Sequence, residues 1–387
     1  MRKIALSLAI AIGFVLMAVS GAWAAATEQV LYSFTDGSDG GYPMAGLIFD
    51  AAGNLYGTTS SGGVYDQGTV FELSPSNGTW TETVLYNFRG QGDGGVPAAG
   101  LLMDKAGNLY GTTLRGGVGA AGAVFKLTLS RFGWQESSLY RFGGDNGTSP
   151  SGLVVDKAGH AFGTTQGGGT NGAGTVFGMQ GTKSGWQEVV LYSFVNNGSD
   201  GEAPQSGVAV DSYDLIYGTT PIGGKNGRGT VFELKHSPSG WSERIIYDFE
   251  GGYDGSTPYA GLVLDGAGNL YGTTSSGGDY NQGTVFELSR SQHGWTKTII
   301  YTPSAPPSNA ALTFDQFGNL YGETYDTIFE LSPAKGGWNE TTVLEFDGTD
   351  GQSINGGVIF DQAGNIYGTS QNGGGVFNAG AVFEITP

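Results

Sequence analysis

The chain has 387 residues, including 72 glycines and no cysteine, and its formal net charge at pH 7 is −18. A strongly acidic surface disfavours binding to nucleic acid, anionic membranes and polyanionic glycans, and the lack of cysteine excludes disulfides and thiol chemistry. Cations, neutral sugars and neutral or basic partners remain compatible with this charge.

The first 24 residues have the features of a secretory signal peptide. Arg2 and Lys3 precede an apolar run over residues 4–19, and residues 21–24 supply a small-x-small cleavage site. Because the run is short for a spanning helix, we expect cleavage after Ala24 rather than retention as a signal anchor. No second apolar segment of spanning length follows. We therefore expect an exported protein, periplasmic or extracellular, with no membrane span after cleavage.

One phrase, Gly-Asn-Leu-Tyr-Gly-Thr-Thr, recurs seven times along the chain, intact or altered. The copies are spaced 46 to 55 residues apart. They centre on Tyr56, Tyr110, Phe162, Tyr217, Tyr271, Tyr321 and Tyr367. Repeats of this size are typical of solenoids, propellers and arrays.

Each repeat contains four short segments typical of β-strands. They are rich in β-branched and aromatic residues and are bounded by Gly, Asp, Asn and Ser. In the first repeat they span residues 46–49, 54–58, 68–73 and 83–88. The first three are almost continuously apolar, as in strands buried on both faces, whereas the fourth alternates like a half-exposed outer strand.

The two ends of the chain complement each other. Residues 28–34 form a fourth-strand sequence with no first three strands before it, and residues 357–385 supply three strands with no fourth. Together they complete a seventh sheet, which a closed ring requires and a solenoid does not. The sequence therefore predicts an all-β, seven-bladed β-propeller of four-stranded antiparallel blades, closed by the N-terminal strand. The predicted domain spans residues 25–387, with repeats at 46–88, 100–142, 152–194, 207–249, 261–301, 311–346 and 357–385.

The combined repeat motif resembles that of the bacterial GloVer (Gloeo/Verruco) tandem-repeat proteins. It reads Asp-x-x-Gly-Asn-Leu-Tyr-Gly-Thr-Thr at residues 50–59, Gly-Thr-Val-Phe-Glu-Leu at 68–73, Gly-Trp at 133–134 and Leu-Tyr-Ser-Phe at 31–34. The resemblance covers residues 28–387 and implies an exported protein of a family with a variable choice of C-terminal anchor. This chain ends at Ile385-Thr386-Pro387 without an anchor segment, so surface attachment stays open. The resemblance implies no biochemical activity.

In a propeller, the loops from fourth to first strand and from second to third strand emerge on one face, here called the long-loop face. These are the long, variable segments of this chain, so we expect binding there. The candidate ligand-binding residues are Tyr65, Asp66, Arg115, Lys225, Arg228, Asp279 and Tyr280. Phe377 and Asn378 occupy similar positions in the last repeat. The alternative interpretation is a set of solvated loop tips.

Most inter-blade loops carry an Asp-Gly pair. The aspartates are Asp39, Asp93, Asp200, Asp254 and Asp350. A ring of carboxylates and backbone carbonyls could hold Ca²⁺, the one cofactor that the sequence leaves open. Asp-Gly is also ordinary turn chemistry, and no loop contains the full set of ligands of a calcium-binding loop.

The sixth repeat departs from the pattern. Its inter-blade loop, residues 303–307, lacks Asp-Gly, its next loop shrinks to Tyr325-Asp326, and Glu323 replaces the usual first threonine. Glu323 is the one catalytic candidate, as a carboxylate facing the channel, unless the repeat is simply degenerate. The three histidines lie in separate blades, and neither Gly-x-Ser-x-Gly nor His-Glu-x-x-His occurs.

Three functional hypotheses follow. The first is a monomeric, non-catalytic propeller that binds a neutral glycan, a peptide or a surface protein through the long-loop face. The second is a cation-dependent hydrolase, lactonase or lyase with its site at the channel mouth. The third is a structural spacer in a larger envelope assembly.

Overall fold

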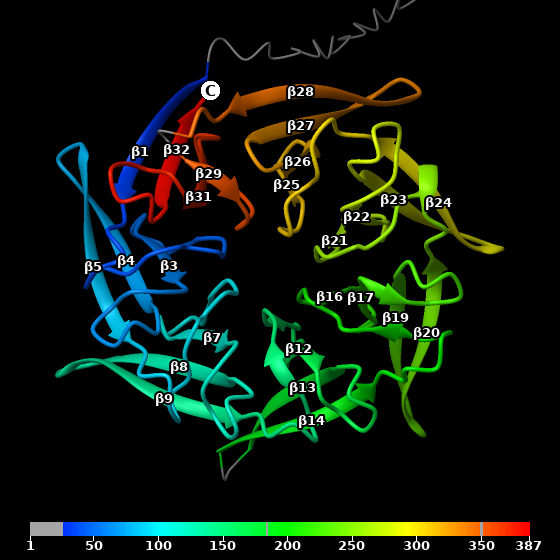
Figure 1. Cartoon of the computed structure of the whole chain (residues 1–387), viewed down its shortest axis with the longest axis horizontal. Helices are drawn as coiled ribbons and strands as arrows, with labels where there is room; N and C mark the ends of the chain where they lie inside the picture. Colours follow the sequence, from blue (N-terminus) through cyan, green and yellow to red (C-terminus); the bar gives the residue numbers. More distant parts are fainter. Residues whose placement is uncertain (1–25, 183–184, 349–350) are drawn as a thin grey trace, which may run out of the picture.

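The computed structural model describes residues 26–182, 185–348 and 351–387. Within them, seven antiparallel sheets stand as blades around a central axis (Figure 1). The predicted seven-bladed β-propeller is therefore confirmed. The predicted signal peptide and the candidate metal ligand Asp350 lie outside the described residues.

The strands of blades 1 to 3 follow each other in chain order from the axis outwards. Blade 1 consists of β2 (Ile48–Phe49), β3 (Leu55–Thr59), β4 (Thr69–Ser76) and β5 (Thr79–Asn87). Blade 2 consists of β6 (Leu102–Met103), β7 (Leu109–Thr113), β8 (Ala123–Ser130) and β9 (Gly133–Arg141). Blade 3 consists of β11 (Val154–Val155), β12 (Ala161–Gly167), β13 (Thr175–Thr182) and β14 (Gly185–Ser193), with β10 (Thr148–Pro150) also paired to β12.

Blades 4 to 6 repeat this arrangement. Blade 4 consists of β16 (Ala209–Val210), β17 (Ile216–Thr220), β19 (Thr230–Ser237) and β20 (Gly240–Asp248), beside a separate pair of β15 (Gly201–Glu202) and β18 (Ile222–Gly223). Blade 5 follows the 3₁₀ helix η1 (Gly252–Asp254) and consists of β21 (Val263–Leu264), β22 (Leu270–Thr274), β23 (Thr284–Ser291) and β24 (Gly294–Tyr301). Blade 6 consists of β25 (Thr313–Phe314), β26 (Leu320–Glu323), β27 (Thr327–Ala334) and β28 (Gly337–Glu345).

Blade 7 is built from both ends of the described chain. It contains β29 (Gln352–Ile354), β30 (Ile359–Phe360), β31 (Ile366–Asn372) and β32 (Ala381–Thr386), and its outer strand is β1 (Thr27–Ser33). The β1–β32 register shifts at Leu31, as the register of β4 and β5 shifts at Leu85 in blade 1. β1 is therefore a fourth strand in every detail, and it closes the ring beside β32 (Figure 1).

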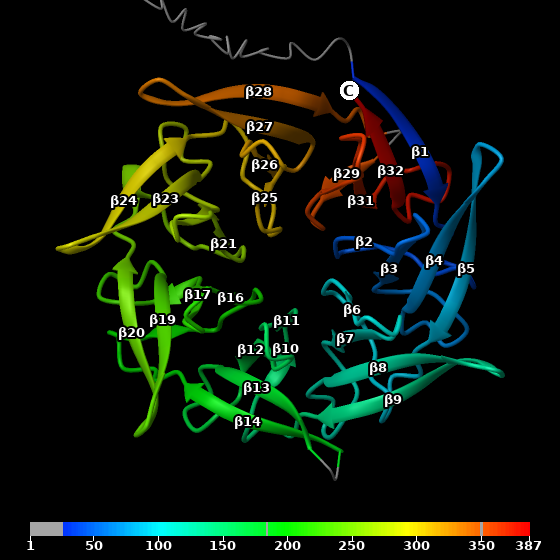
Figure 2. The same cartoon turned by 180° about the vertical axis from the view of Figure 1, so that it is seen from behind.

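The innermost strands are shorter than the sequence predicts. Residues 46–49 were expected as a strand, but pairing covers only Ile48 and Phe49. The strand is shorter because Gly46 lies at the axis, against the backbone of the neighbouring blade, and not beside a strand of its own sheet. Figure 2 shows the short inner strands β2, β6, β11, β16, β21 and β25 gathered around the axis.

The glycine of the Tyr-Gly-Thr motif makes room for the third strand. A Cβ on Gly57 would lie 2.5 Å from Cζ of Phe71, whose ring is fully buried. The six other blades have the same arrangement, with the nearest phenylalanine ring atom 2.3 to 2.7 Å from the added Cβ. The recurring motif is thus explained by packing of the scaffold.

The hydrophobic clusters lie at the seams between adjacent blades. At the seam of blades 1 and 2, Phe88 from the outer strand packs edge-on against Phe125, with ring centroids 5.0 Å apart. The tryptophan of most blades contacts the second strand of the preceding blade, as Trp295 contacts Tyr217 with centroids 5.9 Å apart. Each seam buries apolar surface that a single blade would leave in water.

Small residues let the blades meet at the axis. A Cβ on Gly46 would lie 2.4 Å from the carbonyl oxygen of Gly356 in blade 7, a rigid backbone atom. At the equivalent Gly100 in blade 2, the nearest atom to such a Cβ is the oxygen of Gly46, 3.8 Å away. Gly46 therefore has far less room for a side chain, at the seam between blades 7 and 1, than Gly100 has at the seam between blades 1 and 2.

This difference predicts unequal effects of two alanine substitutions. Gly46→Ala should lower the free energy of unfolding by about 2 kcal/mol, because the new methyl group overlaps a backbone oxygen. Gly100→Ala, the matched control, should change it by less than about 0.5 kcal/mol. Urea unfolding followed by tryptophan fluorescence measures both. Equal effects would show that the seam has room for the methyl group.

Removal of β1 tests the closing strand. A chain that lacks residues 26–34 loses the pairing with β32 and the packing of Phe34 on Phe71. We expect it to show no cooperative thermal unfolding by circular dichroism, whereas a chain that lacks only residues 1–24 should melt sharply. A truncated chain that melts at the same temperature as this control would contradict the assignment of β1 as the closing strand.

Candidate functional site

The loops between second and third strands are held rigidly on the long-loop face. Six of the seven share one hydrogen bond, in which the last loop glycine donates to the first, as Gly68 N donates to Gly62 O at 3.1 Å. Five of these six are also tied to the next blade, as Val96 N donates to Gln67 O at 2.8 Å; the loop of blade 5 lacks this bond because Pro306 has no N–H. Val96 adopts a φ of 56°, a strained conformation for a β-branched residue that this contact enforces.

Exposed aromatic side chains occupy four consecutive blades on this face. They are Tyr280 in blade 5, Tyr325 in blade 6, Phe377 in blade 7 and Tyr65 in blade 1, and they are 49% to 65% exposed. Closure of the ring makes these blades neighbours, so we call the four residues the aromatic arc. The guanidinium of Arg89 lies 5.7 Å from the centroid of the Tyr65 ring.

Of the seven predicted ligand-binding residues, four lie in blades 1 and 5, which carry arc tyrosines, and three lie in blades 2 and 4. All seven are exposed on the long-loop face. Two aspartates flank arc tyrosines: Asp66 accepts hydrogen bonds from its own loop at Gly62 N, 3.2 Å away, and Asp279 accepts one from Thr302 Oγ1 at 3.0 Å.

The predicted basic residues lie apart from these pairs. Arg115 projects from blade 2, and Lys225 and Arg228 from blade 4, where Lys225 Nζ lies 3.6 Å from Asp248. Sequence reasoning did not select Tyr325, because the short loop of blade 6 looked degenerate. The signal was present as an aromatic residue at the same loop tip.

The aspartates of the Asp-Gly pairs organise their own loops. Asp39 accepts hydrogen bonds from Tyr32 Oη at 3.1 Å and from Thr35 N at 2.9 Å. Asp93, Asp200 and Asp254 accept equivalent bonds from Tyr86, Tyr192 and Tyr247 at 2.6 to 2.9 Å. Among the described residues, no group of three or more His, Asp or Glu side chains could hold a metal ion. Binding of Ca²⁺ through these aspartates stays a prediction.

In blades 1 and 4, a glutamate on the outer strand lies near one of these aspartates. Burial, reinforced by Asp39, raises the pKa of Glu82 to about 7, and burial with Asp200 and Asp248 raises that of Glu243 to about 8. Within the described chain, one carboxyl oxygen of each is buried without a hydrogen-bond partner. At these two places the nearby aspartate and burial both disfavour ionisation of the glutamate.

Blade 5 replaces this glutamate by a cation. Lys297 holds the strand position of Glu243, since they pair with Leu288 and Leu234 respectively. Its ammonium group donates to Asp254 Oδ1 at 2.9 Å and also to the carbonyl oxygen of Asp254. Protonation of Glu243 in blade 4 and the ammonium group of Lys297 in blade 5 therefore have the same effect. Each avoids a second negative charge beside the loop aspartate.

Glu323 is buried at the seam between blades 6 and 7. It is 4% exposed, and its Oε2 accepts hydrogen bonds from Ser308 Oγ at 3.2 Å and from Gly357 N at 3.4 Å. In four other blades a threonine holds this place and donates to the next blade, as Thr219 donates to Ala260 O at 2.8 Å. Burial raises the pKa of Glu323 to about 7. Glu323 therefore replaces the hydrogen bond that a threonine donates across the seam by one that it accepts from Gly357 N of blade 7.

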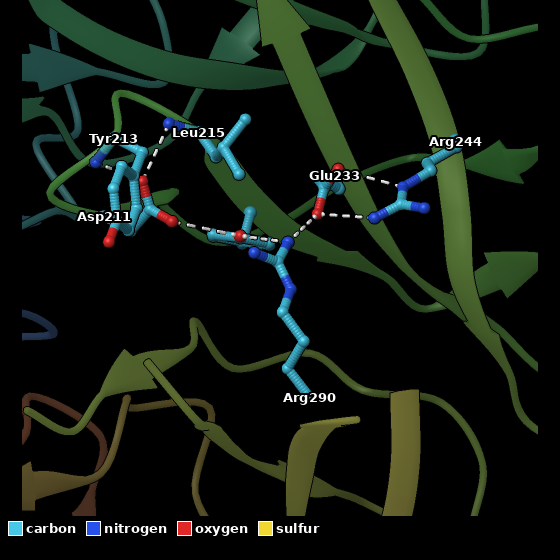
Figure 3. A network of polar contacts seen from close by, with 7 residues as sticks. Asp211, Tyr213, Leu215, Glu233, Arg244 and Arg290 are labelled. Atoms are coloured by element: carbon cyan, nitrogen blue, oxygen red, sulfur yellow. Dashed lines mark hydrogen bonds and ion pairs between the residues drawn. The ribbon is translucent and has the colours of Figure 1, made fainter. Parts of the chain in front are cut away.

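A chain of polar contacts crosses from blade 4 to blade 5 on the opposite, tight-turn face, which carries the first-to-second-strand turns (Figure 3). Buried Glu233 accepts hydrogen bonds from Arg244 Nε and Nη2 at 2.9 and 3.0 Å and from Arg290 Nη2 at 2.8 Å. Arg290 also donates to Tyr217 Oη, and that hydroxyl donates to Asp211. Two guanidinium groups satisfy one buried carboxylate, so we interpret this network as a structural connection between blades.

The sequence profile of the Gloeobacter/Verrucomicrobia repeat matches residues 21–210 and 186–326. The chain belongs to this repeat family. A search of curated protein sequences finds no significant match.

Solved structures similar to this chain include an extracellular domain and a bacterial surface component. The extracellular domain of a protein described as a hybrid two-component system from B. thetaiotaomicron has a TM-score of 0.61 and 12% identity, over 92% of this chain and 39% of that one. PorZ, a surface component of the type-IX secretion system of Porphyromonas gingivalis, has a TM-score of 0.53 and 14% identity, over 89% and 46%.

A gluconolactonase from Xanthomonas campestris is similar at a TM-score of 0.45 and 15% identity, over 72% of this chain and 82% of that one. Identities this low show a shared fold alone. No helix in the described ranges is long and apolar enough to span a membrane.

In a Gloeobacter/Verrucomicrobia repeat protein, residues shared by all blades are explained by the scaffold. The informative positions are those where single blades depart from the repeat. Lys297, Glu323 and Tyr325 are such departures, and they fall in the neighbouring blades 5 and 6. The first two adjust seams, and only the third is exposed to solvent.

Glu243 should give the fold a pH dependence with a defined sign. Its pKa rises from 4.5 to about 8 on folding, so the folded protein binds this proton more tightly. Its stabilising effect is fully present below pH 4.5 and is lost as the pH rises through 8. Glu243→Gln, which stays neutral, should therefore be more stable than the unmodified protein at pH 9 by about 1 to 3 kcal/mol.

Urea unfolding at pH 4 and pH 9 measures this effect. Glu340→Gln is the matched control, because Glu340 holds the same strand position in blade 6 and is exposed. It should leave the stability unchanged at both pH values. A Glu243→Gln protein that is no more stable than the unmodified one at pH 9 would show that folding does not raise the pKa of Glu243.

Proposed function

We propose that this protein is an exported, non-catalytic repeat propeller that binds a glycan, a peptide or a cell-surface partner through its long-loop face. The aromatic arc carries this proposal. Four exposed aromatic residues lie on four consecutive blades, each at the tip of a loop. Large apolar side chains gathered on one face of a monomeric protein often mark an interaction site.

The loops that carry the arc suit recognition. Hydrogen bonds within the loop or to the next blade fix each backbone, so little conformational entropy is lost when a ligand binds. Tyrosine offers a ring for stacking and a hydroxyl for hydrogen bonding, and Arg89 and Asp279 add polar groups beside Tyr65 and Tyr280. A neutral sugar ring or a peptide fits this combination.

The enzymatic alternative receives less support. A general base must reach the proton it removes, and a pKa near 7 such as that of Glu323 would suit the task. Glu323 is buried at a seam, however, where its carboxylate binds Ser308 and Gly357. The arc, by contrast, is open to solvent.

Glycan and peptide arrays test the proposal. The chain without residues 1–24 should bind at least one array component, and replacing both Tyr65 and Tyr280 by Ala should weaken that binding about tenfold or more. Tyr213→Ala is the control, since Tyr213 is even more exposed but lies on the tight-turn face. Absence of any ligand, or equal binding by all three proteins, would contradict the proposal and would favour a structural spacer.

A further inference from the structure

The tight-turn face contains a hollow that the long-loop hypothesis does not use. A cavity of about 1480 Å³ opens between blades 6, 7 and 1, where the first-to-second-strand turns surround the channel mouth. Pockets for small molecules commonly measure about 300 to 1,000 Å³. The hollow is therefore large enough for several residues of a peptide.

One wall position holds a phenylalanine in these three blades and in no other blade. The residue before the turn aspartate is Phe314 in blade 6, Phe360 in blade 7 and Phe49 in blade 1, and all three line the cavity. The other four blades have Met, Val, Val and Leu at this position, at residues 103, 155, 210 and 264. Phe317, 80% exposed, adds a fourth ring at the rim.

Every ionisable group that lines the hollow is acidic. They are Asp315, Asp361, Asp50 and Glu330. The turn aspartates are fixed by their own loops, as Asp50 accepts hydrogen bonds from Ala52 N at 2.8 Å and Asn54 Nδ2 at 2.8 Å. Burial opposes ionisation of Asp50, but the hydrogen bonds from Asn54 and Ala52 outweigh it and lower its pKa below the ordinary value. Equivalent hydrogen bonds from their own loops hold the carboxyl groups of Asp315 and Asp361 in the same orientation.

Two of the other four blades place lysine where this sector has neutral residues. The position after the turn aspartate is Lys105 in blade 2 and Lys157 in blade 3, but Gln316 in blade 6 and Gln362 in blade 7. A smaller hollow beside blades 3 to 5 is lined by Lys157 and Arg290 as well as by aspartates. The large hollow is therefore the negative and aromatic sector of the channel mouth.

We propose that this hollow binds an extended basic peptide segment that carries aromatic or aliphatic side chains. Guanidinium and ammonium groups stack on phenylalanine faces and are attracted by fixed carboxylates, and apolar side chains bury against the four rings. An acidic peptide would be repelled. A neutral glycan would use the rings but would gain nothing from the charge. The site lies on the opposite face from the aromatic arc and is independent of it.

Fluorescence anisotropy with a labelled Arg-Phe-Arg-Phe-Arg peptide tests this site on the chain without residues 1–24. We expect binding that weakens with added salt, and no binding of the Glu-Phe-Glu-Phe-Glu counterpart. Replacing both Gln316 and Gln362 by Lys should weaken binding about tenfold or more. These lysines fit the turn, because blades 2 and 3 already carry them. Phe317→Ala should also weaken binding, and alanine is the residue that most blades have there.

The control variants make the same changes in blade 4. Ser212→Lys and Tyr213→Ala occupy the same two turn positions, and both should leave the affinity unchanged. Three outcomes would overturn the proposal: no binding of the basic peptide, equal binding of the acidic one, or equal effects of the blade 4 and blade 6 variants. Binding of a neutral oligosaccharide that Phe317→Ala weakens and the two lysines do not would overturn it too, and would identify a glycan site.

Discussion

The pairing of β1 with β32 is the interaction on which the rest of the molecule depends. The hydrophobic clusters lie between blades, so each blade is stable only where it has two neighbours. Blade 7 would lack its outer strand without β1, and blade 1 would lose the packing of Phe34 against Phe71. No disulfide replaces this contact, because the chain has no cysteine. The hydrogen bonds and apolar contacts of one strand therefore hold the ring closed.

Closure also creates both candidate binding surfaces. The aromatic arc brings Tyr65 from blade 1 beside Phe377 from blade 7, and the hollow brings Phe49 beside Phe360. The residues of each pair are about three hundred positions apart in the sequence and become neighbours only when the last blade meets the first. The sector that depends most on closure is also the sector that is richest in exposed aromatic residues. This coincidence couples the stability of the ring to its proposed function.

The repeats made the architecture predictable, because a motif that recurs seven times with complementary ends has few other solutions. They also concealed the details that depend on neighbouring blades. The burial of Glu323 and the raised pKa of Glu243 beside Asp200 arise from contacts across seams, and no local pattern signals them. The hollow was missed because its aromatic character comes from one position that varies between repeats. Its significance emerges only when blades 6, 7 and 1 are placed side by side.

Native-state hydrogen exchange of one pair of amides tests the central claim most directly. Phe34 N donates to Gly380 O at 2.9 Å across the closing pair, and Phe249 N donates to Gly229 O at 3.1 Å at the equivalent place in blade 4. If β1 holds the ring closed, both amides should exchange only through global unfolding, with the same opening free energy. Exchange of the Phe34 amide at a much lower opening free energy than that of Phe249 would show that β1 detaches while the ring stays folded, and would contradict the account.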